Sequence, residues 1–387
     1  MLLTAAFVLQ TVMSFLMMVP LVLAPSILPA FGLPQETAGF YAPLVFGPSL
    51  LSAVLSGKLI ARVGAWKVIC VACGVSGVGL LVASSGSLAA LAIGAGIIGL
   101  SYGTGTPAGS SVVLDEQPRR IGLALSVRQT GVPLGIGLAG IVAPNLSNVY
   151  GWSGACLILG GTSVLFAGAI SLLVTAPIRD RVKRRMSLLE PLKLVIHDKR
   201  LLVTTLIVTI LSGVQNCVWS FLSLFLVTHV GLDLVTAGLM IGIFQGAGIV
   251  GRIGWGLLSD YIIAPRLLLA LLGLATGCTL LNLAYLSAGS TSALIVLSVI
   301  VIGLTATGWN GVYLAEVAQA APEGTTAAIT GATIVYSFSG FIILPMLFSL
   351  VFASYGFPAA FIAIGGLSIV TVMPSLAARF RARVAPR

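Results

Sequence analysis

The chain has 387 residues, of which 58% are hydrophobic and only 8% are charged. A typical soluble domain carries about 25% charged residues, so this composition leaves too little polar surface for a water-soluble globule. It disfavours a disordered chain, a disulfide scaffold and a cytosolic enzyme. The net charge of +10 comes from short groups of Lys and Arg between long apolar runs. Such spacing is typical of membrane-protein loops rather than of a nucleic-acid-binding face.

The long apolar runs predict an all-α membrane protein. A helix needs about 20 apolar residues to cross the hydrocarbon core. A β-barrel is excluded because the apolar runs are too long and do not alternate between apolar and polar residues. We expect twelve membrane-spanning helices, near 2–29, 37–57, 67–86, 88–113, 121–145, 152–175, 201–229, 234–258, 266–287, 291–315, 326–350 and 357–378.

The basic residues predict which side of the membrane each loop faces. Lys58, Arg62 and Lys67 lie between the second and third spans, and eight further Lys and Arg residues lie within 179–200. The connections expected on the opposite side contain no Lys or Arg: 30–36, 84–88, 146–151, 229–233, 287–291 and 351–356. By the positive-inside rule, both termini are expected in the cytoplasm, and a bacterial inner membrane is the expected location.

The chain also reads as two related halves. Residues 176–200 are basic and contain no long apolar run, so they predict a cytoplasmic linker, partly an amphipathic surface helix. It separates a six-helix bundle at 1–175 from a second at 201–378, with a cytoplasmic tail at 379–387. Equivalent features recur at a nearly constant offset: Gly57 and Gly256, Glu116 and Glu316, Thr130 and Thr330. Such a 6+6 repeat predicts a binding site near the membrane midplane.

Two loop segments carry a family resemblance. Residues 57–67 read Gly-Lys-Leu-Ile-Ala-Arg-Val-Gly-Ala-Trp-Lys, and residues 251–260 read Gly-Arg-Ile-Gly-Trp-Gly-Leu-Leu-Ser-Asp. They resemble the G-x-L-x-D-R-x-G loop of the major facilitator superfamily, which occurs between helices 2 and 3 and more weakly between helices 8 and 9. The resemblance implies cytoplasmic gating loops built on Gly57, Arg62, Gly64, Arg252, Gly256 and Asp260. Ala61 replaces the family's acidic residue in the first copy, which puts the N-half charge latch in doubt.

Arg128 is the most informative intramembrane residue. It should lie about 12 Å into the fifth span, where a buried guanidinium is costly and usually faces a cavity. Gly131, Pro133 and Gly135 follow it and should bend the helix. The functional interpretation is an anion-binding Arg; the alternative is an Arg that reaches toward the cytoplasm or binds a structural carbonyl. The ten acidic residues all map to loops or helix ends, so no midplane carboxylate is expected to carry protons.

The resemblance places spans 1, 4, 7 and 10 around a central cavity, which extends the candidate substrate-binding set. Its members are polar or aromatic residues deep in spans: Arg128, Gln129, Gln10, Tyr102, Gln215, Asn216, Trp219, Gln245, Asn310 and Tyr336. Three G-x-G-x-x-G matches, beginning at Gly94, Gly135 and Gly246, lack the strand context of a dinucleotide site and predict close helix packing instead.

These features together predict a secondary transporter that moves a small solute by alternating access. The first substrate hypothesis is a small organic or inorganic anion. Efflux of amphipathic drugs is the alternative, with Met13, Met17 and Met18 as lining, and a channel or receptor is a more distant one. No enzyme motif, catalytic residue, metal cluster or cofactor site is visible. The expected partners are a small-molecule substrate and the lipid bilayer, without nucleic acid, and the chain is expected to act as a monomer.

Overall fold

The computed structural model describes residues 2–115, 121–173, 189–322 and 326–384, and every regular element in those ranges is a helix. Ten helical stretches are long and apolar enough to cross a membrane. Two of them, Val127–Leu173 and Ile329–Leu376, are 47 and 48 residues long and contain a non-helical glycine, so each makes two spans. Counting them as pairs gives the predicted twelve, and the all-α membrane fold is confirmed.

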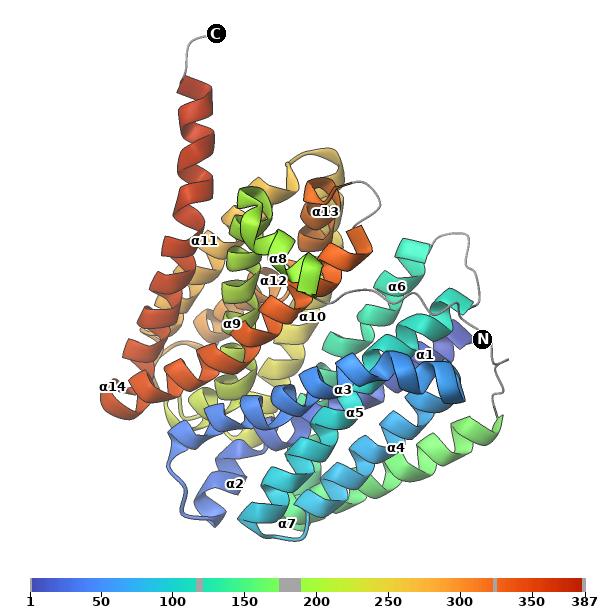
Figure 1. Ribbon diagram of the computed structural model, residues 1–387. Coiled ribbons are helices and arrows are strands. Elements are labelled where there is room, and N and C mark those ends of the chain that lie inside the picture. The colour runs from blue at the N-terminus through green and yellow to red at the C-terminus, as the bar shows by residue number, and fades with distance from the viewer. Residues whose placement is uncertain (1, 116–120, 174–188, 323–325, 385–387) are drawn as a thin grey trace. The chain divides into compact units, whose positions relative to one another are not determined.

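The helices of the first half follow the predicted order. Their bounds are α1 Leu2–Val22, α2 Ala24–Ala30, the short 3-10 helix η1 Gln35–Phe40, α3 Tyr41–Val63, α4 Ala65–Ala83, α5 Leu88–Asp115, α6 Ile121–Gln129 and α7 Gly131–Leu173. The second half contains α8 Leu189–His197, α9 Lys199–Thr228, α10 Leu234–Tyr261, α11 Pro265–Leu283, α12 Ser292–Ala306, α13 Asn310–Ala320 and α14 Thr326–Val384. Figure 1 shows these elements in sequence colours.

Two glycines turn the longest helices. Gly151 in α7 has φ 71° and ψ 168°, and Gly356 in α14 has φ 78° and ψ 178°. These backbone conformations are open to glycine and rare for other residues. Across the second turn the rings of Phe352 and Phe357 stack with centroids 4.0 Å apart. Figure 1 shows α14 reversing direction there. Both expected connections, 146–151 and 351–356, are therefore tight glycine turns.

Three predicted spans are interrupted, the fifth of them directly before the residues that we expected to bend it. The first breaks at Leu23, the fifth at Thr130, and the tenth between α12 and α13. At the first break, α2 starts with a proline in its first turn, where the missing N–H costs no helical hydrogen bond. Hydropathy alone does not reveal such breaks, because the flanking residues remain apolar.

The structure divides into two compact units. The first comprises Met1–Lys183 with Ser220–Thr228 and Leu232–Gln245, and the second comprises Arg184–Trp219, His229–Gly231 and Gly246–Arg387. Buried side chains from α1, α4, α5 and α7, among them Leu9, Ile69 and Val112, form a core of the first unit. The corresponding core of the second unit draws on α8, α9, α11, α13 and α14. The boundaries at 175 and 201 stay a prediction.

Close glycine contacts repeat within the two units. In the first unit, a Cβ on Gly77 would lie 2.8 Å from the carbonyl oxygen of Gly160. In the second unit, a Cβ on Gly277 would lie 2.7 Å from that of Gly365. In the first unit, a Cβ on Gly135 would also lie 2.1 Å from the carbonyl oxygen of Thr11, and in the second unit a Cβ on Gly340 would lie 2.0 Å from the carbonyl oxygen of Thr209. Each unit thus packs its helices at equivalent places, as a duplicated bundle should.

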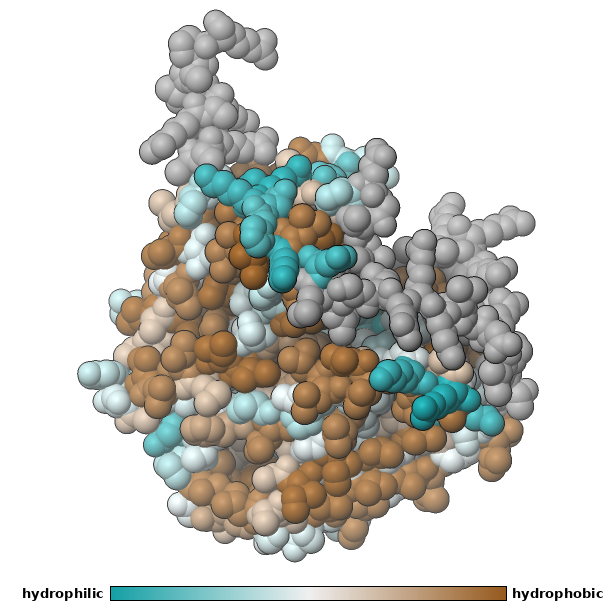
Figure 2. Space-filling view, in the orientation of Figure 1, coloured by the Kyte–Doolittle hydropathy of each residue, from teal (hydrophilic) through white to brown (hydrophobic). Residues whose placement is uncertain are grey.

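The outer faces of many helices are apolar. Leu165, Leu172 and Val250 are among the large hydrophobic side chains that remain more than 60% exposed. Figure 2 shows apolar side chains over much of the visible face. In water such a surface would be costly, whereas in a bilayer it contacts lipid.

Candidate functional site

Arg128 lies in the last turn of α6 and is only 1% exposed. Its Nη1 donates to Gln10 Oε1 on α1 at 2.7 Å. Its Nη2 donates to Ser110 Oγ on α5 at 3.0 Å and to Gln129 Oε1 at 3.2 Å. As expected, the main partners come from other helices rather than from its own helix face.

All three acceptors of the Arg128 guanidinium are neutral. No ion pair to Arg128 occurs among the side chains that the structure describes, and its Nε has no hydrogen-bond partner there. Neutral acceptors satisfy individual N–H groups but do not cancel a full charge in a low-dielectric region. The site therefore presents a positioned, incompletely compensated cation, which is suited to binding an anion.

Gly109 on α5 makes room for this guanidinium. A Cβ at position 109 would lie 3.0 Å from Arg128 Nη1 and 2.9 Å from Ile69 Cδ1. The neighbouring Ser110 then presents its hydroxyl to the guanidinium. Sequence reasoning missed Gly109 and Ser110, because small residues are frequent throughout α5 and only the fold brings this pair to α6.

The predicted bend residues lie directly after the helix break at Thr130. A Cβ on Gly131 would lie 2.8 Å from Thr11 Oγ1, and one on Gly135 would lie 2.1 Å from the Thr11 carbonyl oxygen. Pro133 is buried in the first turn of α7. The glycines therefore let α7 pack tightly on α1, the helix that also supplies Gln10.

Two further candidates belong to the first unit. Tyr102 is half-buried on α5. Gln245 on α10 is 1% exposed, and neither its Oε1 nor its Nε2 has a hydrogen-bond partner in the described part of the chain. A Cβ on Gly137 of α7 would lie 3.3 Å from the Gln245 Cβ, so the small residue admits this amide.

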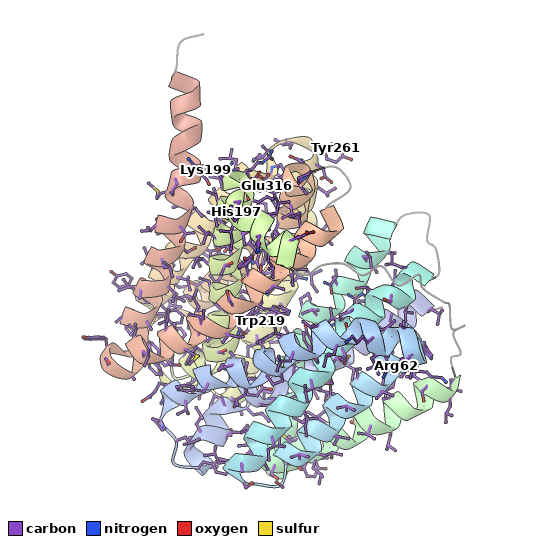
Figure 3. All side chains as sticks on the ribbon, viewed as in Figure 1. Arg62, His197, Lys199, Trp219, Tyr261 and Glu316 are labelled. Atoms are coloured by element: carbon purple, nitrogen blue, oxygen red, sulfur yellow. The ribbon has the colours of Figure 1, made fainter. Side chains whose placement is uncertain are left out.

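Three candidates share α9 in the second unit. Asn216 Nδ2 donates to the Phe341 carbonyl oxygen at 2.6 Å, and the Trp219 ring lies 5.8 Å from the Phe341 ring. Gln215 Oε1 and Trp219 Nε1 are buried without a partner among the described residues. Figure 3 labels Trp219 on this helix. A buried polar atom without a hydrogen-bond partner costs free energy unless a water molecule or a bound solute supplies that partner.

Two other predicted residues have structural partners. Asn310 Nδ2 donates at 3.3 Å to the Thr307 carbonyl oxygen across the break between α12 and α13. The Tyr336 hydroxyl donates at 3.2 Å to the Leu192 carbonyl oxygen of α8. Val195 of α8 is fully buried in the second unit's core, so protein covers the helix side that we expected to lie on the membrane.

Three of the six predicted gating residues are exposed, namely Gly57, Arg62 and Asp260, and the other three are half-buried. Gly64 has φ 87° and joins α3 to α4, which explains its glycine. Arg62, labelled in Figure 3, and Asp260 are both exposed. Arg252 Nε donates at 3.0 Å to the Thr307 carbonyl oxygen that the break in the tenth span leaves without a helical partner. A Cβ at Gly57 or Gly256 would meet nothing within 4 Å.

One acidic residue corrects the expectation that all acids are at loops or helix ends. Glu316 lies inside α13 and is 1% exposed. Its Oε1 accepts from Arg200 Nε at 3.1 Å and its Oε2 from Nη2 at 3.4 Å, while Arg200 remains 45% exposed. The ion pair joins the start of α9 to α13 inside the second unit. Hydropathy could not reveal it, because the span predicted from the apolar run ended at residue 315, directly before Glu316.

The glycine motifs contribute to helix packing. A Cβ on Gly94 would lie 2.4 Å from the Gly79 carbonyl oxygen, and one on Gly99 would lie 2.1 Å from that of Val45. Gly246 is different, because a Cβ there would meet nothing within 4 Å. Close approach of membrane helices through small residues is thus observed at most of the predicted positions.

Comparison with known proteins decides the family. Residues 6–345 match the model of the Major Facilitator Superfamily. The chain belongs to the Major Facilitator Superfamily. It is 28% identical over 276 residues to the uncharacterized transporter YycB of Bacillus subtilis (strain 168), a match that covers 69% of this chain and 65% of that relative. An uncharacterized MFS-type transporter of Mycobacterium tuberculosis (strain CDC 1551 / Oshkosh) is 25% identical over 300 residues, which are 77% of this chain and 66% of that relative.

Solved structures share the fold. The nucleoside transporter NupG superposes with a TM-score of 0.82 at 15% identity, covering 97% of this chain and 99% of that chain. A bacterial homolog of the human lysosomal transporter Spinster, in its inward-facing and occupied conformation, gives 0.78 at 16% identity, with 98% and 96% covered. The chain therefore shares the multi-pass helical fold of these transporters. It spans slightly less than two thirds of the length of the two relatives from Bacillus subtilis and Mycobacterium tuberculosis.

Proposed function

We propose that this transporter moves a small organic or inorganic anion by alternating access, and that Arg128 binds the anion. The proposal rests on one observation: a guanidinium that is 1% exposed and is held by three neutral acceptors on α1, α5 and α6. Both termini of the chain are proposed to lie in the cytoplasm, because the basic residues gather on one side of the predicted topology.

The surroundings of Arg128 support a binding role over a purely structural one. A structural cation in a membrane is normally paired with a carboxylate, since an unpaired buried charge is expensive. Here Nε is left without a partner among the described side chains. A bound carboxylate or oxyanion would supply both the missing acceptor and the missing charge.

The drug-efflux alternative loses its main support. Met13, Met17 and Met18 are 0%, 3% and 1% exposed. A Cβ on Gly105 would lie 2.3 Å from Met13 Cε, so this methionine fills a gap between α1 and α5. The methionines serve as packing residues rather than as the lining of a drug site.

Transport in proteoliposomes tests the proposal. A panel of radiolabelled monocarboxylates, dicarboxylates, inorganic anions and cationic dyes is offered to the wild type, Arg128→Gln and Arg128→Lys. Lys193→Gln, which removes an exposed cation from α8, is the matched control. Each variant is first checked for insertion and for a single peak in size-exclusion chromatography.

We expect uptake of at least one anion by the wild type and the control. Arg128→Gln should lose it, because losing a charge-assisted contact costs about 2–5 kcal/mol, or roughly 30-fold or more in affinity. Arg128→Lys should retain only part of the wild-type anion uptake, since an ammonium lacks the planar pair of N–H donors of the guanidinium. Normal anion uptake by well-folded Arg128→Gln, or uptake of the cationic dyes alone, would refute the proposal.

A further inference from the structure

An apolar groove opens on the first unit, and Arg128 is not among its lining residues. It has a volume of about 440 Å³ and is formed by α3, α4 and α5. Its lining residues are Leu59, Val63, Lys67, Val68, Val71, Ala72, Val75, Leu100, Ser101 and Thr104. Val68, Ala72 and Ser101 are each 3% exposed, and Val71 is 62% exposed. The buried residues thus form the floor, and exposed aliphatic side chains form the rims.

The polar atoms in this groove are already satisfied. Ser101 Oγ donates to the Ile98 carbonyl oxygen at 2.7 Å, and its hydroxyl also contacts that of Ser76 at 2.5 Å. Thr104 Oγ1 donates to the Ser101 carbonyl oxygen at 3.0 Å. The groove therefore offers a hydrocarbon surface without a free hydrogen-bonding group along most of its length. Such a surface suits an acyl chain and does not suit a polar solute.

Lys67 places a cation at one end of the groove. It is exposed in the first turn of α4, directly after the Gly64 turn, and Lys58 and Arg62 are exposed one helical turn apart at the end of α3. None of the three forms an ion pair with a side chain that the structure describes. The related family motif has an acid at the position of Ala61, so this chain lacks the carboxylate that would neutralise the cluster locally.

The groove can hold part of the length of an acyl chain. From Lys67 to Val75 it follows eight residues of α4, which corresponds to about 12 Å along the helix axis. The cation marks the end at which a lipid headgroup would lie, and the aliphatic walls continue toward the membrane interior. Charge at one end and hydrocarbon along the rest match a phospholipid with an anionic headgroup.

We propose that this groove is a binding site for one anionic phospholipid. One acyl chain lies along Val71 and Val75, and the lipid phosphate binds Lys67 with support from Arg62 and Lys58. The site is separate from the anion proposed at Arg128 and does not depend on it. The positive charge favours phosphatidylglycerol over a zwitterionic lipid with the same chains.

Native mass spectrometry of the purified, delipidated full chain tests the site. Phosphatidylglycerol and phosphatidylcholine with identical acyl chains are titrated against the wild type, Lys67→Gln and Val71→Trp. Lys193→Gln is the charge control. Val250→Trp is the volume control, because Val250 is 64% exposed on α10 against 62% for Val71. Each variant must retain a monodisperse elution profile and a melting temperature near that of the wild type.

We expect the wild type to bind the first phosphatidylglycerol at least about fivefold more tightly than phosphatidylcholine, the contribution of about one cation near an anionic headgroup. Lys67→Gln should bring the two affinities within twofold of each other, and Val71→Trp should weaken the first binding step for both lipids. The two controls should behave as the wild type. Equal affinity for the two lipids in the wild type would overturn the proposal, as would an unchanged preference in Lys67→Gln.

Discussion

Asp233 determines how α10 begins. Its Oδ1 accepts from the backbone N–H of Val235 and Thr236, both at 3.0 Å, and its Oδ2 accepts from Thr236 Oγ1 at 2.6 Å. The hydroxyl of Thr236 and then these backbone donors hold the pKa of Asp233 below its ordinary value of 3.8. The ionised carboxylate is therefore the form that the folded helix end stabilises.

This cap predicts a pH dependence of stability. Because the folded-state pKa is lowered, the stabilisation is fully present above pH 3.8 and is lost as the pH falls through the lower folded value. Asp233→Ala should lower the melting temperature at pH 7, and the difference from the wild type should shrink as the pH falls below 3.8. Asp260→Ala, which removes an exposed carboxylate from the far end of the same helix, is the control variant.

Glu316 and Arg200 form an ion pair in which the carboxylate is 1% exposed and the guanidinium 45% exposed. Arg200→Gln should leave a carboxylate that is 1% exposed without its cation, and we expect a loss of about 1–3 kcal/mol in unfolding free energy. The double variant Arg200→Gln with Glu316→Gln should recover part of the lost unfolding free energy, because no unpaired carboxylate is left buried. Lys199→Gln is the control. If Arg200→Gln melts as the wild type does, the pair has no structural role.

At the scale of the helices, contacts between small residues fix how closely neighbours approach. Gly135 and Gly161 lie on the same helix, α7, but only Gly135 faces another backbone, at 2.1 Å from the Thr11 carbonyl oxygen for an added Cβ. Gly135→Ala should lower stability by about 1–3 kcal/mol because α1 and α7 must separate. Gly161→Ala should be neutral or slightly stabilising, since helical Ala is favoured over Gly.

Thermal unfolding in detergent measures the difference between these two variants. We expect Gly135→Ala to melt at a lower temperature and to bind the anion more weakly, because α1 carries Gln10, which accepts a hydrogen bond from Arg128. Equal melting temperatures for Gly135→Ala and Gly161→Ala would show that the α1–α7 contact relaxes freely.

At the scale of the whole molecule, the topology remains to be tested. In a background free of cysteine, Asn148→Cys and Lys193→Cys place exposed thiols in the 146–151 turn and on α8. An impermeant maleimide added to intact cells should label position 148 and should label position 193 only after the membrane is opened. The reverse pattern would invert the predicted orientation, which rests on the placement of Lys and Arg.

Much of the architecture could be predicted from the sequence, because a bilayer imposes a simple constraint. Twenty apolar residues with polar ends make a span, so the number and order of the helices follow from hydropathy. The breaks at Leu23 and Thr307 could not be predicted, since they depend on packing and on local hydrogen bonding of the backbone, whereas the break at Thr130 lies directly before the predicted bend.

The candidate site was only partly predictable for a related reason. An Arg inside an apolar run is visible as an anomaly, and Arg128 is indeed buried. Its ligand Ser110 and the space at Gly109 depend on which faces of α5 and α6 meet, and sequence spacing does not determine that. Tyr336 was predicted as a candidate from its depth in a span, and the contact of its hydroxyl with the Leu192 carbonyl oxygen of α8 was not foreseen.

Anion binding to purified protein tests the central claim most directly. The melting temperature is measured for the wild type, Arg128→Gln and Lys193→Gln with a panel of anions, neutral solutes and cations at constant ionic strength. A ligand that binds the folded state at 100 times its dissociation constant should contribute about 2.7 kcal/mol of stability. The account predicts that at least one anion raises the melting temperature of the wild type and of Lys193→Gln and has no effect on Arg128→Gln. An equal rise in folded Arg128→Gln, or stabilisation of the wild type by cations alone, would contradict it.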